Sequence, residues 1–270
     1  MPLALEYESH RIQAGVARWM DALDGDTPEI QLTIRLLGID APEMHYPGTT
    51  KPSAFDRKLE RLLETHRAHF RSRGLREHLA PKLADRPGTR QLLWGQRAKN
   101  ALKQLAVERL HQRAGGQTRY RPLYLTVGEE RFDQHRRLLA YVAPEEKNPE
   151  KRRTFNLLLM EAGWAVNYIL YPNLPKPEDW ERLQKAVRQA RHEKRGFWED
   201  ELLLLGYEFR FCVDTLLGKR TGPDKYCVDI TTGILYKPHE YYLVEPENRL
   251  FIPKEHLRQA RRAIKGLKTR

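Results

Sequence analysis

The sequence predicts an α+β fold in which short strands and three helices share a core, with a helical insertion and a small C-terminal unit of strands and one helix. Three observations predict it. Apolar residues alternate in short runs such as EIQLTIRL, which is typical of strands with one buried face. Apolar residues recur at helical spacing in longer segments. From residue 201 onward, strand-like runs alternate with turn sequences.

Composition bounds the size of the core and the class of partner. The chain has 270 residues, with 48 lysines and arginines against 36 acids and a net charge of +12. This length suits one large core with additions or two small domains, and we expect a division into 1–200 and 201–270. The positive charge favours nucleic acid as the partner, with an anionic membrane surface as the next choice.

Neither a membrane span nor a signal peptide is visible in the sequence. No apolar run approaches the roughly 18 residues that cross a bilayer, and no basic segment precedes an apolar core near the start. We therefore expect a cytoplasmic protein, or an exported one if the sequence has been trimmed. Cys212 and Cys227 are too few for a zinc site, and both buried free thiols and a hairpin disulfide remain open.

The first elements are strands within residues 11–37, around the turn sequence DGDTP. In the last of these strands Arg35 points away from the apolar face. Gly38 and Pro42 then shape a stiff loop that brings Asp40 and Glu43 close to this arginine. Such a cluster is either a surface ion pair worth under ~1 kcal/mol or a phosphate clamp beside a metal ligand and a base.

We expect residues 44–94 to form a basic helical insertion. Phe55, Leu59, Leu62 and Phe70 recur at helical spacing within it, and Lys51 to Leu93 hold eleven basic residues against five acids. Because the insertion leaves the chain directly after Glu43, we expect it to flank the candidate site.

The core continues with three helices and two strands. The helices are expected from Gly95 to Ala114, where Gly115 and Gly116 stop the first, from Thr154 to Ala162, and from the NLPKPED segment to residue 196. The strands are expected at 121–127 and 136–143. Adjacent residues of a strand point to opposite sides, so Arg137 can share a face with Arg35 while Arg136 faces solvent.

The arginine pair and the acids suit phosphodiester chemistry. Two guanidinium groups at fixed positions hold a phosphodiester and stabilise the charge that develops in the transition state. A glutamate near a water molecule acts as a general base, and a pair of carboxylates suits a hard cation such as Ca²⁺.

Residues 201–270 read as an extension. YEFRFCV, KYCVDI and EYYLV alternate as strands do, and Pro253 opens a final helix. Lys254 to Arg270 contain seven basic residues against one acid, so the outer face of this helix is strongly positive. We expect the extension to contact a protein partner or a second copy of the chain.

Several motifs together resemble the staphylococcal nuclease (thermonuclease) family. In chain order they are RLLGIDAPE, a helix that starts at Gly95, DQHRRLLAY, FNLLLMEAGWA, YPN and EKRGFW. The resemblance covers about 11–200, interrupted by 44–94. It implies a five-stranded OB-type β-barrel with three helices. It also implies Ca²⁺-dependent hydrolysis of DNA or RNA at the 5′-oxygen, which leaves 3′-phosphate ends.

The resemblance assigns roles to individual residues. Arg35 and Arg137 match the two phosphate-binding arginines, and Glu43 matches the general base. Asp40 matches a metal ligand, with the backbone carbonyl of Ala41 beside it.

Three more residues match positions that contact the substrate. Tyr171 and Tyr168 fall where the family places tyrosines against the terminal phosphate and the base, although the local spacing differs. His135 stands at an aromatic position of a loop.

The second metal aspartate of the family lies in a DGDT motif, which this chain has at 24–27. Only seven residues separate Thr27 from Arg35, too few for two paired strands. Either Asp26 keeps the ligand role and the barrel has lost a hairpin arm, or DGDT is itself a hairpin turn. In the second case the ligand position falls near 13–15, and Glu8 or His10 would substitute. Asp26 as ligand is the interpretation we favour.

Three functions are consistent with the sequence. The first is an active metal-dependent nuclease, supported by the joint presence of Arg35, Glu43 and Arg137. The second is a weak or inactive nuclease-like module that binds nucleic acid, supported by the uncertain metal aspartate and the basic segments. The third is binding to a membrane surface, against which the basic helices show no exposed tryptophan-rich edge.

Overall fold

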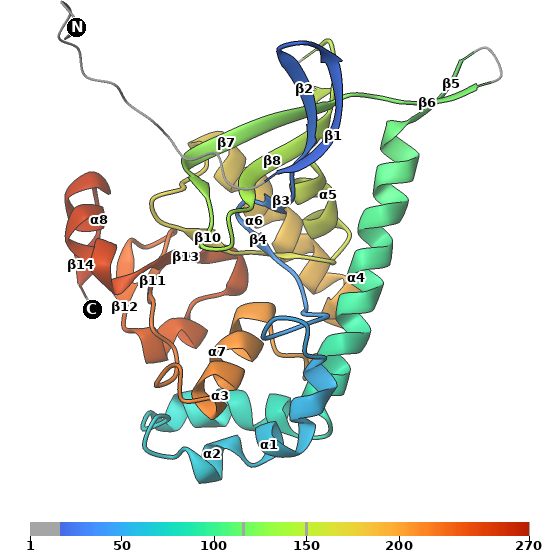
Figure 1. Cartoon of the computed structure of the whole chain (residues 1–270). Coiled ribbons are helices and arrows are strands. Elements are labelled where there is room, and N and C mark those ends of the chain that lie inside the picture. The colour runs from blue at the N-terminus through green and yellow to red at the C-terminus, as the bar shows by residue number, and fades with distance from the viewer. Residues whose placement is uncertain (1–16, 115–116, 149–150, 270) are drawn as a thin grey trace, which may run out of the picture.

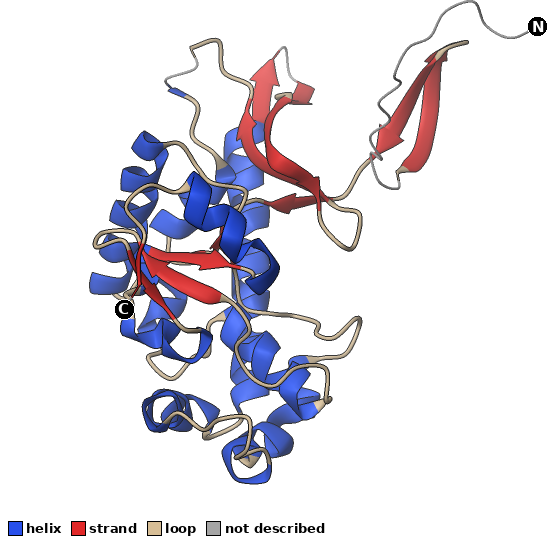
Figure 2. Ribbon diagram, turned by 90° about the vertical axis from the view of Figure 1, so that its left-hand side faces the viewer, coloured by secondary structure: helices blue, strands red, loops and turns tan. Residues whose placement is uncertain are grey.

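The computed structural model describes residues 17–114, 117–148 and 151–269 (Figure 1). The strands are β1 Arg18–Asp24, β2 Thr27–Gln31, β3 Ile34–Leu36, β4 Ile39–Asp40, β5 His111–Ala114, β6 Gln117–Tyr120, β7 Leu123–Phe132, β8 Leu138–Pro144, β9 Val166–Asn167, β10 Ile169–Leu170, β11 Tyr226–Asp229, β12 Ile234–Tyr236, β13 Arg249–Ile252 and β14 Lys268–Thr269. The α-helices are α1 Asp56–Glu60, α2 Leu62–Thr65, α3 Arg73–Leu83, α4 Pro87–Leu110, α5 Phe155–Glu161, α6 Pro177–His192, α7 Gly206–Leu216 and α8 Leu257–Ala263. The α+β prediction is confirmed (Figure 2).

Local sequence explains several helix boundaries. The Ser72 hydroxyl caps α3 by accepting a hydrogen bond from the Leu75 amide at 3.3 Å. Thr154 caps α5 in the same way. Pro87 and Pro177 open α4 and α6, where the missing N–H costs no helical hydrogen bond. In the part of the chain with described structure, no helix is both apolar enough and long enough for a bilayer.

The strands next to the candidate site are β3, β8 and β7. β3 runs parallel to β8, with Arg35 opposite Leu139, and β8 pairs antiparallel with β7. Gly38 has a φ of +74°, which only glycine adopts readily, and it redirects the chain so that β4 pairs with β9. Arg137 directly precedes β8, and its neighbour Leu138 pairs with Ile34, so Arg137 lies at the end of the sheet next to Arg35.

The described strands do not close into one five-stranded barrel. They form separate sheets in the orders β3-β8-β7, β4-β9, β1-β2, β5-β6 and β10-β13-β11-β12-β14. The expected barrel is therefore not seen in these ranges, because β3 and β4 are short and the β1–β2 ladder runs only between these two strands.

The DGDT sequence is the turn of the β1–β2 hairpin. Asp24 pairs with Thr27, so Gly25 and Asp26 form the turn, which is exposed. The turn lies at the end of the hairpin away from Gln31, which leads into β3 (Figure 1). The structure therefore follows the second alternative for DGDT, not the favoured one.

The insertion is helical, as expected, and forms the end of the molecule opposite the β1–β2 hairpin (Figure 1). Phe55, Leu59, Leu62 and Phe70 are all buried, which confirms the spacing argument. The boundaries of the following helix were wrong: α4 starts before Gly95 and ends at Leu110, where the backbone enters the paired strands β5 and β6. The expected glycine stop at 115–116 lies outside the described residues.

In the extension, YEFRFCV is helix α7 and not a strand, and EYYLV lies largely in the 3₁₀ helix Pro238–Leu243. Alternation over seven residues does not separate a strand from a helix that is buried on nearly every side. Strand β11 and helix α8 agree with the prediction. Cys212 and Cys227 are buried free thiols, which decides the alternative left open.

One hydrophobic core joins all three parts of the chain. It contains Ile39 from the strands, Leu59 from the insertion and Phe209 from the extension, all buried. In addition, β10 pairs with β13, so the extension's sheet includes a strand from before residue 200. The expected boundary at residue 200 thus runs through shared packing, and we expect neither side to be stable without the other.

A chain that ends at residue 200 should therefore aggregate or unfold without cooperativity, because core residues such as Ile39 and Leu59 lose their neighbours. A chain that ends at residue 265, which lacks only the edge strand β14, serves as the control and should unfold cooperatively. Urea unfolding followed by tryptophan fluorescence measures both. A cooperative transition in the shorter chain would show two independent domains.

Candidate active site

The loop that carries the predicted acids rests on α4. A Cβ added at Gly95 would lie 2.9 Å from the carbonyl oxygens of Pro42 and Glu43, so helix and loop approach as closely as glycine allows. With its amide turned to satisfy both neighbours, buried Gln91 accepts a hydrogen bond from the Glu43 amide at 3.0 Å. Residues 41–43 are thereby fixed.

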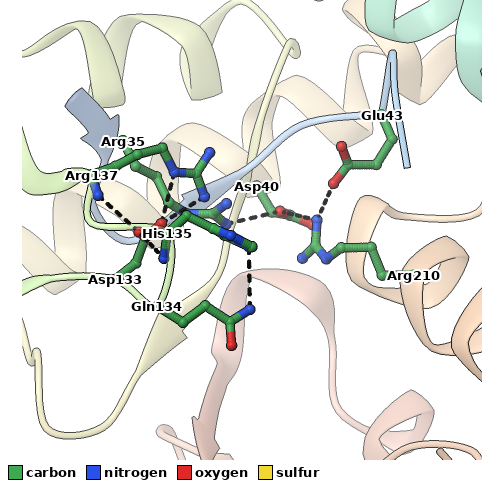
Figure 3. Close-up of polar contacts among 8 residues, drawn as sticks. All are labelled: Arg35, Asp40, Glu43, Asp133, Gln134, His135, Arg137 and Arg210. Atoms are coloured by element: carbon green, nitrogen blue, oxygen red, sulfur yellow. Dashed lines mark hydrogen bonds and ion pairs between the residues drawn. The ribbon is translucent and has the colours of Figure 1, made fainter. Parts of the chain in front are cut away.

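Arg35 and Asp40 meet at the junction of β3 and β4. Nη2 of Arg35 lies 3.6 Å from Oδ1 of Asp40 (Figure 3). The Asp40 side chain is only 3% exposed, and its Oδ2 has no hydrogen-bond partner. The sequence prediction that these two residues lie together is confirmed.

Arg137 is positioned by the loop between β7 and β8. Its Nε and Nη2 contact Oδ2 of Asp133 at 2.8 and 2.6 Å, while the amides of His135 and Arg137 donate to Oδ1. Burial opposes the charge on Asp133, but these donors and the guanidinium lower its pKa. Arg136 is exposed, as expected, but its φ of +59° places it in the turn before β8 and not in a strand. His135 is also exposed, beside Arg137 (Figure 3).

A third arginine, which the sequence analysis missed, enters the site from α7. Nη1 of Arg210 donates to Oδ1 of Asp40 at 2.8 Å and to Oε1 of Glu43 at 2.5 Å (Figure 3). Burial would lower the pKa of Arg210, but the two acids raise it well above its usual range. Burial raises the pKa of Glu43, because desolvation outweighs the attraction of Arg210.

The two predicted tyrosines have different surroundings. Tyr168 stacks on Tyr207 with ring centres 5.2 Å apart, and the Arg210 guanidinium lies 5.6 Å from its ring centre. Tyr168 therefore adjoins the acid pair. Tyr171 is buried, packs against the ring of His256 and lines a different hollow. The structure does not bring Tyr171 to the other site residues.

α7 is anchored two residues before Arg210 by Glu208, whose side chain is fully buried. Its carboxylate contacts His78 and Lys82 of the insertion at 2.8 Å each and accepts the Tyr241 hydroxyl at 2.8 Å. Burial would raise the pKa of Glu208, but Lys82 and His78 hold it well below its usual range. The insertion and the extension thus fix the helix that presents Arg210.

The donors do not fit the implied Ca²⁺ ion. Asp40 has one oxygen without a partner, and its other oxygen contacts Arg210. Calcium takes six to eight oxygen ligands. Within residues 17–114, 117–148 and 151–269, no three His, Cys, Asp or Glu side chains gather as a metal site would require. Asp26 lies in the exposed turn, and the substitutes Glu8 and His10 lie outside these ranges.

As a whole the site gathers three arginines and three carboxylates in two ion-paired groups. Arg35 and Arg210 both contact Asp40 and Arg210 also contacts Glu43, while Arg137 pairs separately with Asp133 (Figure 3). The side chains of Arg35 and Arg137 are about one-third exposed, so a phosphate can reach them from solvent. The arrangement provides two accessible guanidinium groups next to a carboxylate of raised pKa.

Two comparisons match this chain. The family model described as "Staphylococcal nuclease homologue" matches residues 33–200, more than half of the chain. The protein "Endonuclease YhcR" of Bacillus subtilis (strain 168) is 31% identical over 127 residues, which are 46% of this chain and 10% of that relative. The chain thus corresponds to a small part of that protein. The matched family region ends before Arg210.

The Glu208 network predicts a pH-dependent stability. A carboxyl whose folded pKa is lowered stabilises the fold above its unfolded pKa of about 4.3, and this contribution disappears as the pH falls through the folded value. Glu208→Gln should therefore reduce the free energy of unfolding by about 3 kcal/mol at pH 7, and by less as the pH falls below about 4.

Urea unfolding at several pH values tests this prediction. Glu201→Gln, which removes an exposed acid paired with Lys194, is the matched control and should leave the midpoint unchanged at every pH. An equal loss for Glu208→Gln at pH 7 and at pH 3 would contradict the charge argument.

Proposed function

Because the chain belongs to the staphylococcal nuclease homologue family, we propose that it is a nuclease that hydrolyses phosphodiester bonds of DNA or RNA. The observation that supports this most directly is that Arg35 and Arg137, both about one-third exposed, lie at neighbouring positions of β3 and the start of β8, while Glu43, a carboxyl with a raised pKa, is joined through Arg210 to the Asp40 that Arg35 contacts. The relative named as an endonuclease agrees with this class of reaction.

In the proposed reaction, Arg35 and Arg137 bind the phosphate oxygens and stabilise the charge of the pentacoordinate transition state. Glu43 takes a proton from water through Oε2, since Oε1 is held by Arg210. The water oxygen bonds to phosphorus and the bond to the 5′-oxygen breaks. The leaving oxygen takes a proton from solvent, which gives a 3′-phosphate and a 5′-hydroxyl.

The substrate contacts form part of the same proposal. His135 is exposed beside Arg137 and can stack on a base or donate to a phosphate. Tyr168 adjoins the acid pair through Arg210. For Tyr171 and Asp26 the geometry gives no support, because one is buried elsewhere and the other lies in the hairpin turn. No step is assigned to Ca²⁺, whose expected ligands do not fit.

A second candidate is a nucleic-acid-binding module that does not cleave. It is favoured by one observation, namely that the proposed base Glu43 is already paired with Arg210. The exposed basic residues of the insertion would then supply affinity through phosphate contacts.

The deciding experiment incubates the purified full chain with single- and double-stranded DNA and RNA, with Ca²⁺ or with a chelator. Cleavage that is abolished in Glu43→Gln supports the nuclease. Retarded migration in a gel without cleavage under either condition supports the binding module.

Replacing Arg137 by lysine should lower the rate of cleavage by about 100-fold, because an ammonium group cannot reproduce the planar two-point contact with phosphate. Arg136→Lys is the matched control at the neighbouring exposed position and should cleave at the wild-type rate. Initial rates with a labelled oligonucleotide measure both variants. A wild-type rate of cleavage in Arg137→Lys would contradict the proposed contact between Arg137 and the phosphate.

A further inference from the structure

The acids of the proposed nuclease site are neutralised by a residue outside the family region. Arg210 bridges Asp40 and Glu43 through a single nitrogen, and its side chain is 18% exposed. Arg35 contributes a second positive charge, 3.6 Å from the same Oδ1 oxygen of Asp40. Two carboxylates are thus balanced by two guanidinium groups, and the cluster lacks the excess negative charge that attracts a divalent cation.

The first residue of α7 also fills the space beside Asp40. A Cβ added at Gly206 would lie 2.5 Å from both Oδ2 of Asp40 and the carbonyl oxygen of Ala41. Calcium–oxygen distances are about 2.3–2.6 Å, so an ion shared by these oxygens on that side would sit about 1.5 Å from the Gly206 Cα. That position is excluded, and the Oδ1 side is where Arg210 lies.

Helix α7 is fixed in this place from several directions. Glu208 is held by the insertion, and Asp214 at the other end accepts the Tyr46 hydroxyl at 2.7 Å. In residues 206–215, Arg210 is the single member that is not buried. Arg210 is therefore a built-in part of the site and not a group carried on a mobile lid.

We propose that Arg210 is the resident cation of this site and supplies, beside Asp40, the positive charge that the resemblance assigns to Ca²⁺. Arg210 is a positioning residue: it holds both carboxyl groups in place through its hydrogen bonds while Arg35 and Arg137 face the phosphate. The proposal deepens the nuclease assignment and depends on it only for the effect on cleavage. The intact chain then neither binds Ca²⁺ here nor needs it.

Calcium titration of the full chain by isothermal calorimetry tests this without any nuclease assay. Wild type should show no saturable binding up to about 10 mM, which exceeds the roughly 1 mM dissociation constants of weak protein calcium sites. Arg210→Gln, which removes the charge but keeps donors for the two acids, should gain a site with a dissociation constant of about 1 mM or tighter. Adding Asp40→Asn to that variant should abolish the new site.

Arg220→Gln is the matched control. Arg220 also belongs to the extension and also pairs with a buried aspartate, Asp214, at 2.9 Å, but it makes no contact with Asp40. This variant should bind no Ca²⁺. If Arg220→Gln gains a Ca²⁺ site as Arg210→Gln does, loss of any positive charge in this region is enough to produce one, and the proposal fails.

Two results overturn the proposal directly. One is saturable binding by wild type that is lost in Asp40→Asn, and the other is a folded Arg210→Gln that binds no Ca²⁺. If Arg210→Gln does not fold, the wild-type titration decides alone, with absence of binding supporting the proposal and binding lost in Asp40→Asn rejecting it.

The cleavage assay separates this proposal from the proposed function. Wild-type cleavage that is unchanged by a chelator supports a resident arginine cation. Cleavage that requires Ca²⁺ contradicts the proposed role of Arg210 as the resident cation, while the nuclease assignment stands. If no substrate is cleaved at all, the nuclease assignment fails, and the calcium titration still tests the role of Arg210.

Discussion

The close seating of α7 on the loop after β4 is the constraint on which the site depends. Gly206 leaves no space for a side-chain carbon between the helix and the Asp40–Ala41 segment, and Gly95 makes the same approach to Glu43 from α4. The acids are therefore set between two helices and not on a free loop. A rigid frame of this kind holds reacting groups in place without paying for their ordering when substrate arrives.

The segments on either side of the family-like core act together. The insertion supplies His78 and Lys82, the extension supplies Glu208, and their contact orients Arg210 toward acids that precede both in the chain. Neither the insertion nor the extension by itself would hold Arg210 against these acids. This explains why a comparison with family sequences, which ends at residue 200, does not reveal the arginine.

Period-two alternation placed Arg35 off the apolar face of its strand, but Arg137 reaches the same end of the sheet from the turn before β8 and not from a strand position. Alternation failed for YEFRFCV, where burial on nearly all sides removes the polar stripe that marks a helix. A usable signal was present: Glu208 and Arg210 are charged residues in an apolar run, and buried charges require partners. Those partners are distant in sequence, so spacing alone could not name them.

Asp40 and Glu43 lie so close that a cation between them is favourable. Two carboxylates that contact the same nitrogen lie within about 6 Å, where they repel by about 3 kcal/mol at an effective dielectric constant near 20. A soluble ion relieves this repulsion only as far as its concentration allows. An arginine attached to a packed helix is present at every ion concentration and loses no translational freedom. The packing of α7 thus replaces a binding equilibrium with a structural contact.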